Sequence, residues 1–113
     1  MTETWDWPRA TVVDHYDGDT FYADIDLGLE LIRRRLPVRL AGIDTPELRP
    51  LQAGAKEALA YLKSLIPLGS KVLLSSVGYD KYGPRIDAIV SRPDGLNVNE
   101  TMVTAGHAVH KDY

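Results

Sequence analysis

The strict alternation of residues 20–27 constrains the fold of this chain most. In TFYADIDL, one face carries Phe21, Ala23, Ile25 and Leu27, and the other carries Thr20, Tyr22, Asp24 and Asp26. A period of two is typical of a strand with one buried face. Residues 10–27 contain an Asp-Gly pair at 17–18, so they are predicted to form two strands around a turn.

Three further segments have the pattern of strands. In residues 35–44, Leu36, Val38 and Leu40 share one face, and Arg39 lies on the opposite, charged face. KVLLSSV at 71–77 and RIDAIV at 85–90 predict two more strands. The sheet is therefore expected to have five strands.

Two segments of the sequence are predicted to be helical. Residues 51–66 carry apolar side chains at intervals of three and four before Pro67 and Gly69 end the pattern, and a short helix is predicted from an N-cap at Asn99 to Gly106. This order predicts a mainly β fold, an all-antiparallel five-stranded OB-fold barrel with one long and one short helix.

Composition narrows the class of protein. At 113 residues and 44% hydrophobic content, residues 1–113 fit one domain, and the absence of cysteine excludes a disulfide framework and a zinc-thiolate site. No apolar run approaches the ~20 residues of a membrane span, and the N-terminus does not resemble a secretory signal. We therefore expect a cytoplasmic protein with no membrane partner.

Charge is a weak guide to the substrate. The net charge of -3 does not indicate a nucleic-acid binder, yet IRRRLPVR at 32–39 gathers four arginines in one segment. The RRR run is also typical of a solvated strand edge. His15, His107 and His110 have no regular spacing, which argues against a zinc site.

Two acidic motifs follow strand patterns. DGDT at 17–20 and GIDTPE at 42–47 are each typical of a turn when taken alone. Together they would offer two carboxylates and a backbone carbonyl, which are the oxygen ligands that Ca²⁺ or Mg²⁺ requires. Glu47 would lie at the edge of that site as a general base, and Arg39, five residues before Asp44, could bind a phosphate. Metal, glutamate and arginine are the groups that phosphodiester hydrolysis needs.

Four segments resemble the staphylococcal nuclease-like family. They are VVDHYDGDTF, VRLAGIDTPE, DKYG and VNETMVTAGHA, in the order and approximate spacing of that family. The resemblance extends from about residue 10 to residue 108 and implies the OB-type barrel.

Site residues follow from the resemblance by position. Metal binding is implied for Asp19, Asp44 and Thr45, the last through its main-chain oxygen, with Ca²⁺ as the ion and Asp17 in support. Catalytic roles are implied for Glu47 as base and for Arg39 and Arg85 as arginines. Lys81 and Tyr82 of DKYG match positions that contact the phosphate. The implied reaction is Ca²⁺-dependent hydrolysis of DNA or RNA with little sequence preference, leaving 3′-phosphate ends.

Pro84 departs from the family pattern, which places the second arginine directly after the glycine of DKYG. Without a gap, Ile86 takes the family's leucine position and Arg85 points to the opposite face, because a one-residue slip reverses every side chain. If Pro84 is an extra turn residue, Arg85 takes the arginine position and Asp87 takes that of leucine, at a cost unless its carboxylate is paired.

The chain also ends soon after its short helix, whereas well-known family members continue into a further helix. Either Trp5 and Trp7 or a second chain, such as a homodimer partner, would then cover the exposed barrel. The alternative to a nuclease is a catalytically weakened or inactive nucleic-acid-binding or protein-binding domain of the same family. The presence of Asp19, Arg39, Asp44 and Glu47 favours the enzyme.

Overall fold

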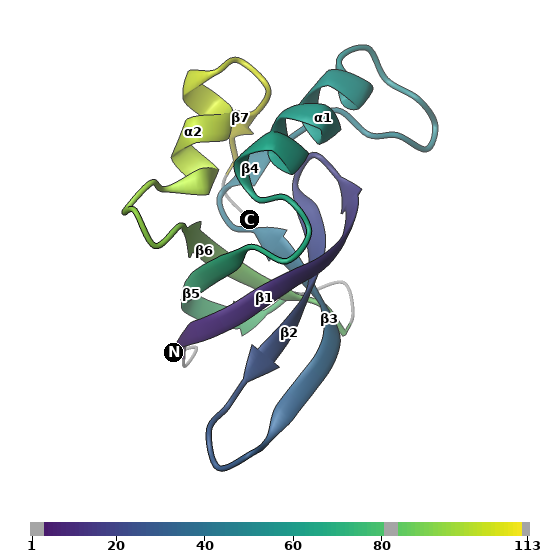
Figure 1. The fold of residues 1–113 in the computed structure, drawn as a ribbon. Helices are drawn as coiled ribbons and strands as arrows, with labels where there is room; N and C mark the ends of the chain where they lie inside the picture. Colours follow the sequence, from purple (N-terminus) through teal and green to yellow (C-terminus); the bar gives the residue numbers. More distant parts are fainter. Residues whose placement is uncertain (1–3, 81–83, 112–113) are drawn as a thin grey trace.

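A computed structural model describes residues 4–80 and 84–111 (Figure 1). Its elements in chain order are β1 (Trp5–Asp17), β2 (Thr20–Asp26), β3 (Ile32–Leu40), β4 (Ile43–Asp44), α1 (Ala55–Leu65), β5 (Lys71–Tyr79), β6 (Ile86–Ser91), α2 (Val98–Thr104) and β7 (Val109–His110). Both helices lie at one end of the barrel, and the β2–β3 hairpin extends from the other end (Figure 1).

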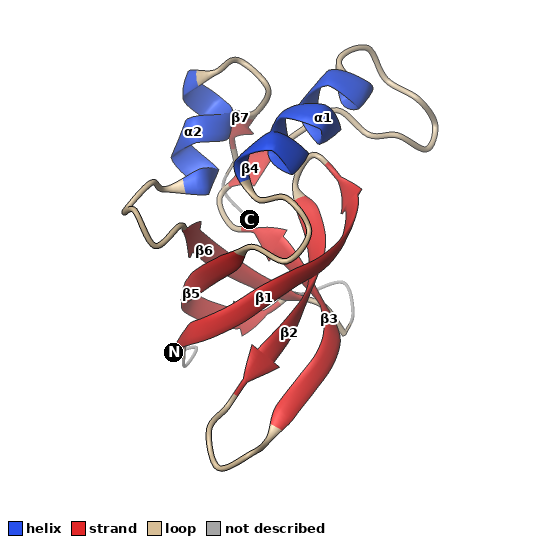
Figure 2. Ribbon diagram, in the orientation of Figure 1, coloured by secondary structure: helices blue, strands red, loops and turns tan. Residues whose placement is uncertain are grey.

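Five strands close into a barrel in the order β1-β2-β3-β6-β5, which confirms the predicted five-stranded OB-type architecture (Figure 2). The prediction that every pair is antiparallel was wrong, because β3 and β6 pair in parallel, with Arg39 opposite Asp87. A parallel pair needs a long crossover connection, and α1 and β5 supply it between β3 and β6.

The alternation of β2 builds the core. Phe21, Ala23 and Ile25 are fully buried, and so are Val38 and Leu40 on the neighbouring strand β3. Leu27 was expected on the same buried face but is about half exposed, because β2 ends at Asp26 and the hairpin leaves the barrel there. Period-two burial therefore holds where strands face the barrel interior.

Helix α1 begins at Ala55 and not at residue 51. Gly54 occupies the N-cap position with a φ of 86°, a left-handed conformation that favours glycine and separates the helix from the preceding turn. Ala55, Ala58 and Leu62 form the buried face that closes one end of the barrel. Within the described residues, neither helix is long and apolar enough to cross a membrane.

The N-cap of α2 is Asn97, so the prediction of Asn99 was wrong. The Oδ1 atom of Asn97 accepts a hydrogen bond of 3.0 Å from the backbone N–H of Glu100. Asn99 is instead buried against the barrel: its Oδ1 accepts from the backbone N–H of Val90 at 2.9 Å, and its Nδ2 donates to the carbonyl of Ala88 at 3.1 Å. Asn99 thereby fastens α2 to β6.

A second, two-stranded sheet was not predicted. β4 pairs with β7, placing Ile43 opposite His110 and Asp44 opposite Val109. This pairing brings the end of the described chain beside the GIDTPE segment.

Candidate active site

The β1–β2 turn packs tightly against α1 and the loop after β4. A Cβ atom added at Gly18 would lie 2.7 Å from the Cβ of Ala58 and 3.0 Å from the Oγ1 of Thr45. Only glycine fits there without movement of its neighbours, because real Cβ atoms do not approach other atoms so closely. The close approach sets the two acidic motifs side by side, although they are more than twenty residues apart in sequence.

Arg39 lies between the two carboxylates predicted to bind metal. Its Nη2 atom is 3.5 Å from Oδ2 of Asp19 and 3.4 Å from Oδ1 of Asp44, and it donates to the carbonyl of Ile43 at 3.0 Å. The Arg39 side chain is 8% exposed and that of Asp19 is 9% exposed. The two carboxylates compensate the positive charge of the buried guanidinium. The arrangement also gathers these charged groups in one place.

Asp19 is further fixed by its own surroundings. The backbone N–H of Thr45 donates to Asp19 Oδ2 at 3.2 Å, and the Thr20 hydroxyl donates to Asp19 Oδ1 at 3.1 Å. The backbone N–H of Asp19 in turn donates to Oδ1 of Asp17 at 3.1 Å. These contacts hold the DGDT turn in one orientation.

Asp17 carries a strongly perturbed carboxyl group. Burial, followed by the side-chain hydrogen bonding and negative charge of the neighbouring Asp19 carboxyl group, raises the pKa of Asp17 to about 7, while backbone hydrogen bonds from Asp19 and Thr20 partly oppose the rise. Two carboxyl groups so close together repel each other when both are ionised, and a bound cation would relieve that repulsion.

The donor set of this cluster fits a hard cation. Asp19 and Asp44 supply carboxylate oxygens on either side of Arg39 Nη2, and the buried Oγ1 of Thr45 has no hydrogen-bond partner among the described residues. No three His, Asp or Glu side chains within residues 4–80 and 84–111 gather closely enough to enclose a metal by themselves. A cation here would therefore need water or substrate oxygens to complete its shell, as Mg²⁺ and Ca²⁺ sites commonly do.

Glu47 lies on the loop after β4 with its carboxylate exposed to solvent. Its backbone N–H donates to Oε1 of Gln52 at 2.7 Å, and its carbonyl accepts from the backbone N–H of Gln52 at 2.8 Å. No ion pair or hydrogen bond of the Glu47 carboxylate is found within the described part of the chain. The loop is fixed while the carboxylate stays available to a water molecule.

Arg85 belongs to a second cluster next to the first. Its Nε atom donates to Oδ2 of Asp80 at 2.7 Å, and the Asp80 side chain is only 5% exposed. The Asp80 carboxyl group also interacts with that of Asp87, which lies opposite Arg39 in the β3–β6 pair and whose buried Oδ1 has no hydrogen-bond partner among the described residues.

Asp87 is half-buried among these groups. Burial, followed by the side-chain hydrogen bonding and negative charge of Asp80, raises the pKa of Asp87 to about 6. The positive charges of Arg39 and Arg85 partly oppose this rise. Arg85, Asp87 and Arg39 therefore share one electrostatic environment.

Several residues lie outside these clusters. Lys81 and Tyr82, predicted to contact the phosphate, are outside the described residues. His15 Nε2 bonds to the carbonyl of Ile66, His107 packs against the ring of Tyr61, and His110 pairs with Glu100.

Sequence reasoning missed Asp80 and Lys111. Asp80 begins the DKYG segment that supports the family resemblance, but no site role was predicted for it. Lys111 Nζ comes within 3.6 Å of Asp44 Oδ2 only because β4 pairs with β7, and that pairing has no local signature.

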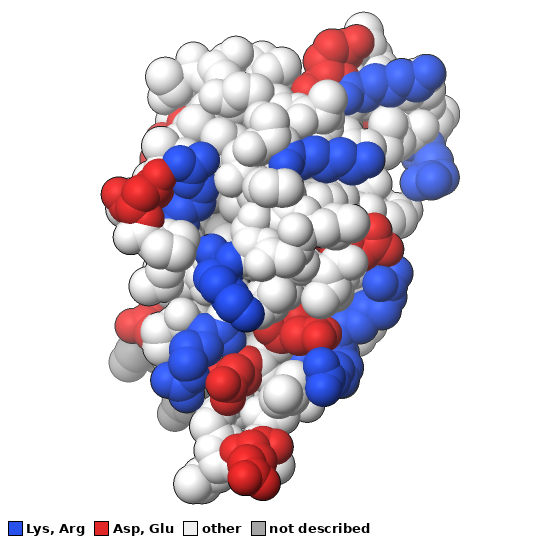
Figure 3. Space-filling model, in the orientation of Figure 1, with Lys and Arg blue, Asp and Glu red and all other residues white. Residues whose placement is uncertain are grey.

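On the side of the molecule shown in Figure 3, surface Lys and Arg side chains are interspersed with Asp and Glu. Within the RRR run, Arg34 pairs with Asp24 and Arg35 pairs with Asp14. Two of these three arginines are thus part of exposed ion pairs.

The closed five-stranded barrel and the carboxylate–arginine cluster beside its β1–β2 turn define an OB-fold domain of the nuclease type. The family model described as staphylococcal nuclease homologue matches residues 37–113, and the chain belongs to this family.

Curated relatives support the assignment. An uncharacterized endonuclease of Escherichia coli is 35% identical over 95% of this chain and 68% of its own length. A probable endonuclease, LCL3, of Schizophyllum commune is 33% identical over 92% of this chain and 44% of its own length.

Proposed function

We propose that this chain is a metal-dependent nuclease that hydrolyses phosphodiester bonds of DNA or RNA with little sequence preference. The single observation that carries the proposal is the position of Arg39 Nη2 between the carboxylates of Asp19 and Asp44. Membership of the nuclease family and the endonuclease names of its relatives support the same reaction class. By resemblance, the bond to the 5′ oxygen is cleaved and a 3′-phosphate remains.

Asp19, Asp44 and the main-chain oxygen of Thr45 would hold the cation, with Asp17 in support. We propose Ca²⁺, a hard ion suited to oxygen donors. When bound, such an ion supplies positive charge that polarises a phosphoryl oxygen.

The side chains around this cluster have separate tasks. Glu47 accepts a proton from the attacking water, because its carboxylate is exposed on a fixed loop. Arg39 and Arg85 donate hydrogen bonds to the phosphate oxygens as negative charge accumulates in the transition state. The Asp80 contact fixes the direction of the Arg85 side chain.

Release of acid-soluble nucleotides from denatured DNA tests the proposal. The parent protein is expected to release nucleotides with Ca²⁺ and not with chelator. Glu47→Gln should lose about a hundredfold or more of the rate, the magnitude typical of a general base. Glu30→Gln is the matched control, because Glu30 lies in the exposed β2–β3 connection and should keep the parent rate. Equal rates for the parent and Glu47→Gln would refute the assigned base.

A second candidate function is a catalytically weakened nucleic-acid-binding domain. The observation that favours it is the pairing of Arg85 with Asp80, since a guanidinium engaged by a buried carboxylate has fewer donors for a phosphate. Metal-independent binding of single-stranded DNA without nucleotide release would support this candidate over the enzyme.

A further inference from the structure

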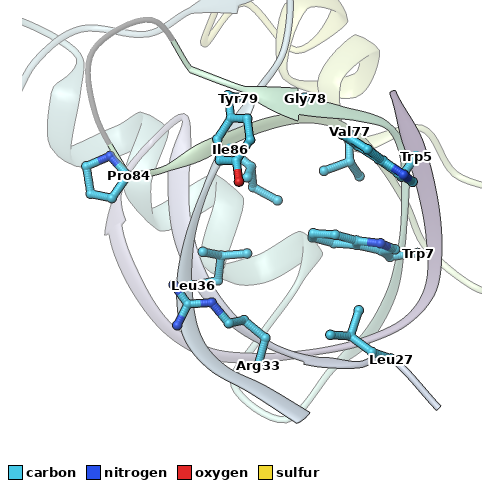
Figure 4. A pocket seen from close by; sticks show the side chains of 10 residues that line it. All are labelled: Trp5, Trp7, Leu27, Arg33, Leu36, Val77, Gly78, Tyr79, Pro84 and Ile86. Carbon is cyan, nitrogen blue, oxygen red and sulfur yellow. The ribbon is translucent and has the colours of Figure 1, made fainter. Parts of the chain in front are cut away.

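A cavity of about 330 Å³ opens at the barrel end opposite the helices (Figure 4). Its floor is formed by the buried residues Leu36, Val77 and Ile86. Trp5 and Trp7 of β1 form one wall, with Trp5 47% exposed and Trp7 half-buried. The volume lies within the ~300–1,000 Å³ typical of small-molecule sites.

The rim of the cavity combines aromatic rings with a cation. Tyr79, at the end of β5, is 79% exposed, and Arg33 enters from β3 (Figure 4). No ion pair or hydrogen bond involves the Arg33 guanidinium within the described residues, in contrast to its neighbours Arg34 and Arg35. Proteins bind the faces of unstacked bases with exposed aromatic rings and with arginine side chains close to them.

The cavity shares its strands with the candidate active site. Leu36 on the floor precedes Arg39 by three residues of β3, or about 10 Å along a strand. Pro84 on the rim directly precedes Arg85, and Ile86 on the floor directly precedes Asp87. Leu36 and Arg39 face opposite sides of β3, so the two sites adjoin at the rim, where Pro84 directly precedes Arg85. A nucleic-acid strand advances roughly 3.4 Å per nucleotide, so a strand held at Arg85 can reach the cavity within a few nucleotides.

From this geometry we propose that the cavity binds one base of a single-stranded nucleic-acid substrate, a few nucleotides from the bond that is cleaved. The base stacks on the indole rings of Trp5 and Trp7, and Arg33 pairs with the adjoining phosphate. This inference rests on the proposed function for its choice of ligand. It assigns a task to residues that cleavage itself does not use.

Tryptophan fluorescence offers a direct readout. The chain has two tryptophans and both line the cavity, so quenching reports on this site. A hexanucleotide of thymidine, titrated in chelator to prevent cleavage, is expected to quench the emission to saturation. A hexamer of abasic sugar phosphates should leave the emission unchanged, because it has the charge without the bases.

Variants then separate this site from the catalytic one. Tyr79→Ala and Arg33→Ala should each weaken hexanucleotide binding about tenfold, as expected for loss of one stacking or phosphate contact. Both side chains are exposed, so the fold should be unaffected. Arg34→Ala is the matched control and should bind like the parent. In cleavage assays the two variants should raise KM for the hexanucleotide and leave a dinucleotide, which is too short to span both sites, unaffected.

The outcomes distinguish the two proposals. Quenching by the hexanucleotide without any metal-dependent cleavage would refute the nuclease and retain the base site. Cleavage with parent-like KM for Tyr79→Ala and Arg33→Ala would overturn the base site and retain the nuclease. A concentration-dependent dimer that Tyr79→Ala abolishes, with no quenching by the oligonucleotide, would show that a second copy of the chain occupies the cavity and would also overturn the base site.

Discussion

Replacing Asp87 with asparagine should stabilise this protein above neutral pH. Burial, together with the hydrogen bond and charge of Asp80, raises the pKa of Asp87 from 3.8 to about 6. The folded protein therefore binds a proton more tightly than the unfolded chain. Stability is greatest while both states are protonated, below about pH 4, and falls as the pH rises through about 6.

The size of the effect follows from that shift. One pKa unit corresponds to 1.36 kcal/mol, so a rise of about two units would cost about 3 kcal/mol at high pH. Asp87 is only half-buried and solvent screens part of the repulsion, which reduces the expected cost to about 1–2 kcal/mol. Asparagine keeps the shape and can donate to Asp80, so Asp87→Asn should regain that amount at about pH 8 and nothing at about pH 4.

Denaturant unfolding in chelator at both pH values measures the difference. Asp94→Asn is the control of opposite sign: Asp94 is exposed, and its hydrogen bond with Arg92 lowers the pKa of its carboxyl group. That variant should gain no stability at about pH 8. If Asp87→Asn is less stable than the parent at about pH 8, or shows the same gain at both pH values, the assigned carboxyl repulsion is refuted.

Three further substitutions test other contacts. Arg85→Ala should lower the cleavage rate a hundredfold or more in the nucleotide-release assay, as expected for an arginine that binds the transition state, whereas Arg34→Ala should change it little. Asn99→Ala should lower the free energy of unfolding by about 1–3 kcal/mol in denaturant titrations, because it leaves the backbone N–H of Val90 without its partner. Asn97→Ala, which removes only a helix cap, should cost about 1 kcal/mol. Gly18→Ala should cost roughly 1–3 kcal/mol by the same measurement, since the added methyl group meets two packed side chains.

Local patterns predicted the elements of this fold but not all of their partners. The alternation of β2 and the spacing of α1 are properties of short segments, so the sequence shows them directly. The parallel β3–β6 pair and the β4–β7 pair join distant segments, and no feature of either segment identifies the other. The choice between Asn97 and Asn99 as N-cap had the same origin, because the barrel uses Asn99 for its own backbone.

Site prediction met a similar limit. The residues of DGDT and GIDTPE were predicted to come together, and the close approach at Gly18 places them in contact. Their catalytic and metal-binding roles stay predictions. The spacing of residues in the sequence does not predict that Arg39 Nη2 lies within 3.5 Å of both carboxylates. Asp80 was missed because its contacts with Arg85 and Asp87 depend on the pairing of β5 with β6, which neither segment indicates by itself.

The parallel pairing of β3 with β6 places Asp87 opposite Arg39, where an unpaired carboxylate would be costly. The Asp80 carboxyl group interacts with that of Asp87 and pairs with Arg85, so two carboxyl groups face two guanidinium groups. When Asp87 loses its proton, near pH 6, the net charge of the cluster falls by one unit on the side that would receive a phosphate. The ionisation of Asp87 that reduces stability therefore also weakens the attraction for substrate, which makes Asp87, like Asp17, a residue through which pH couples the fold to the site.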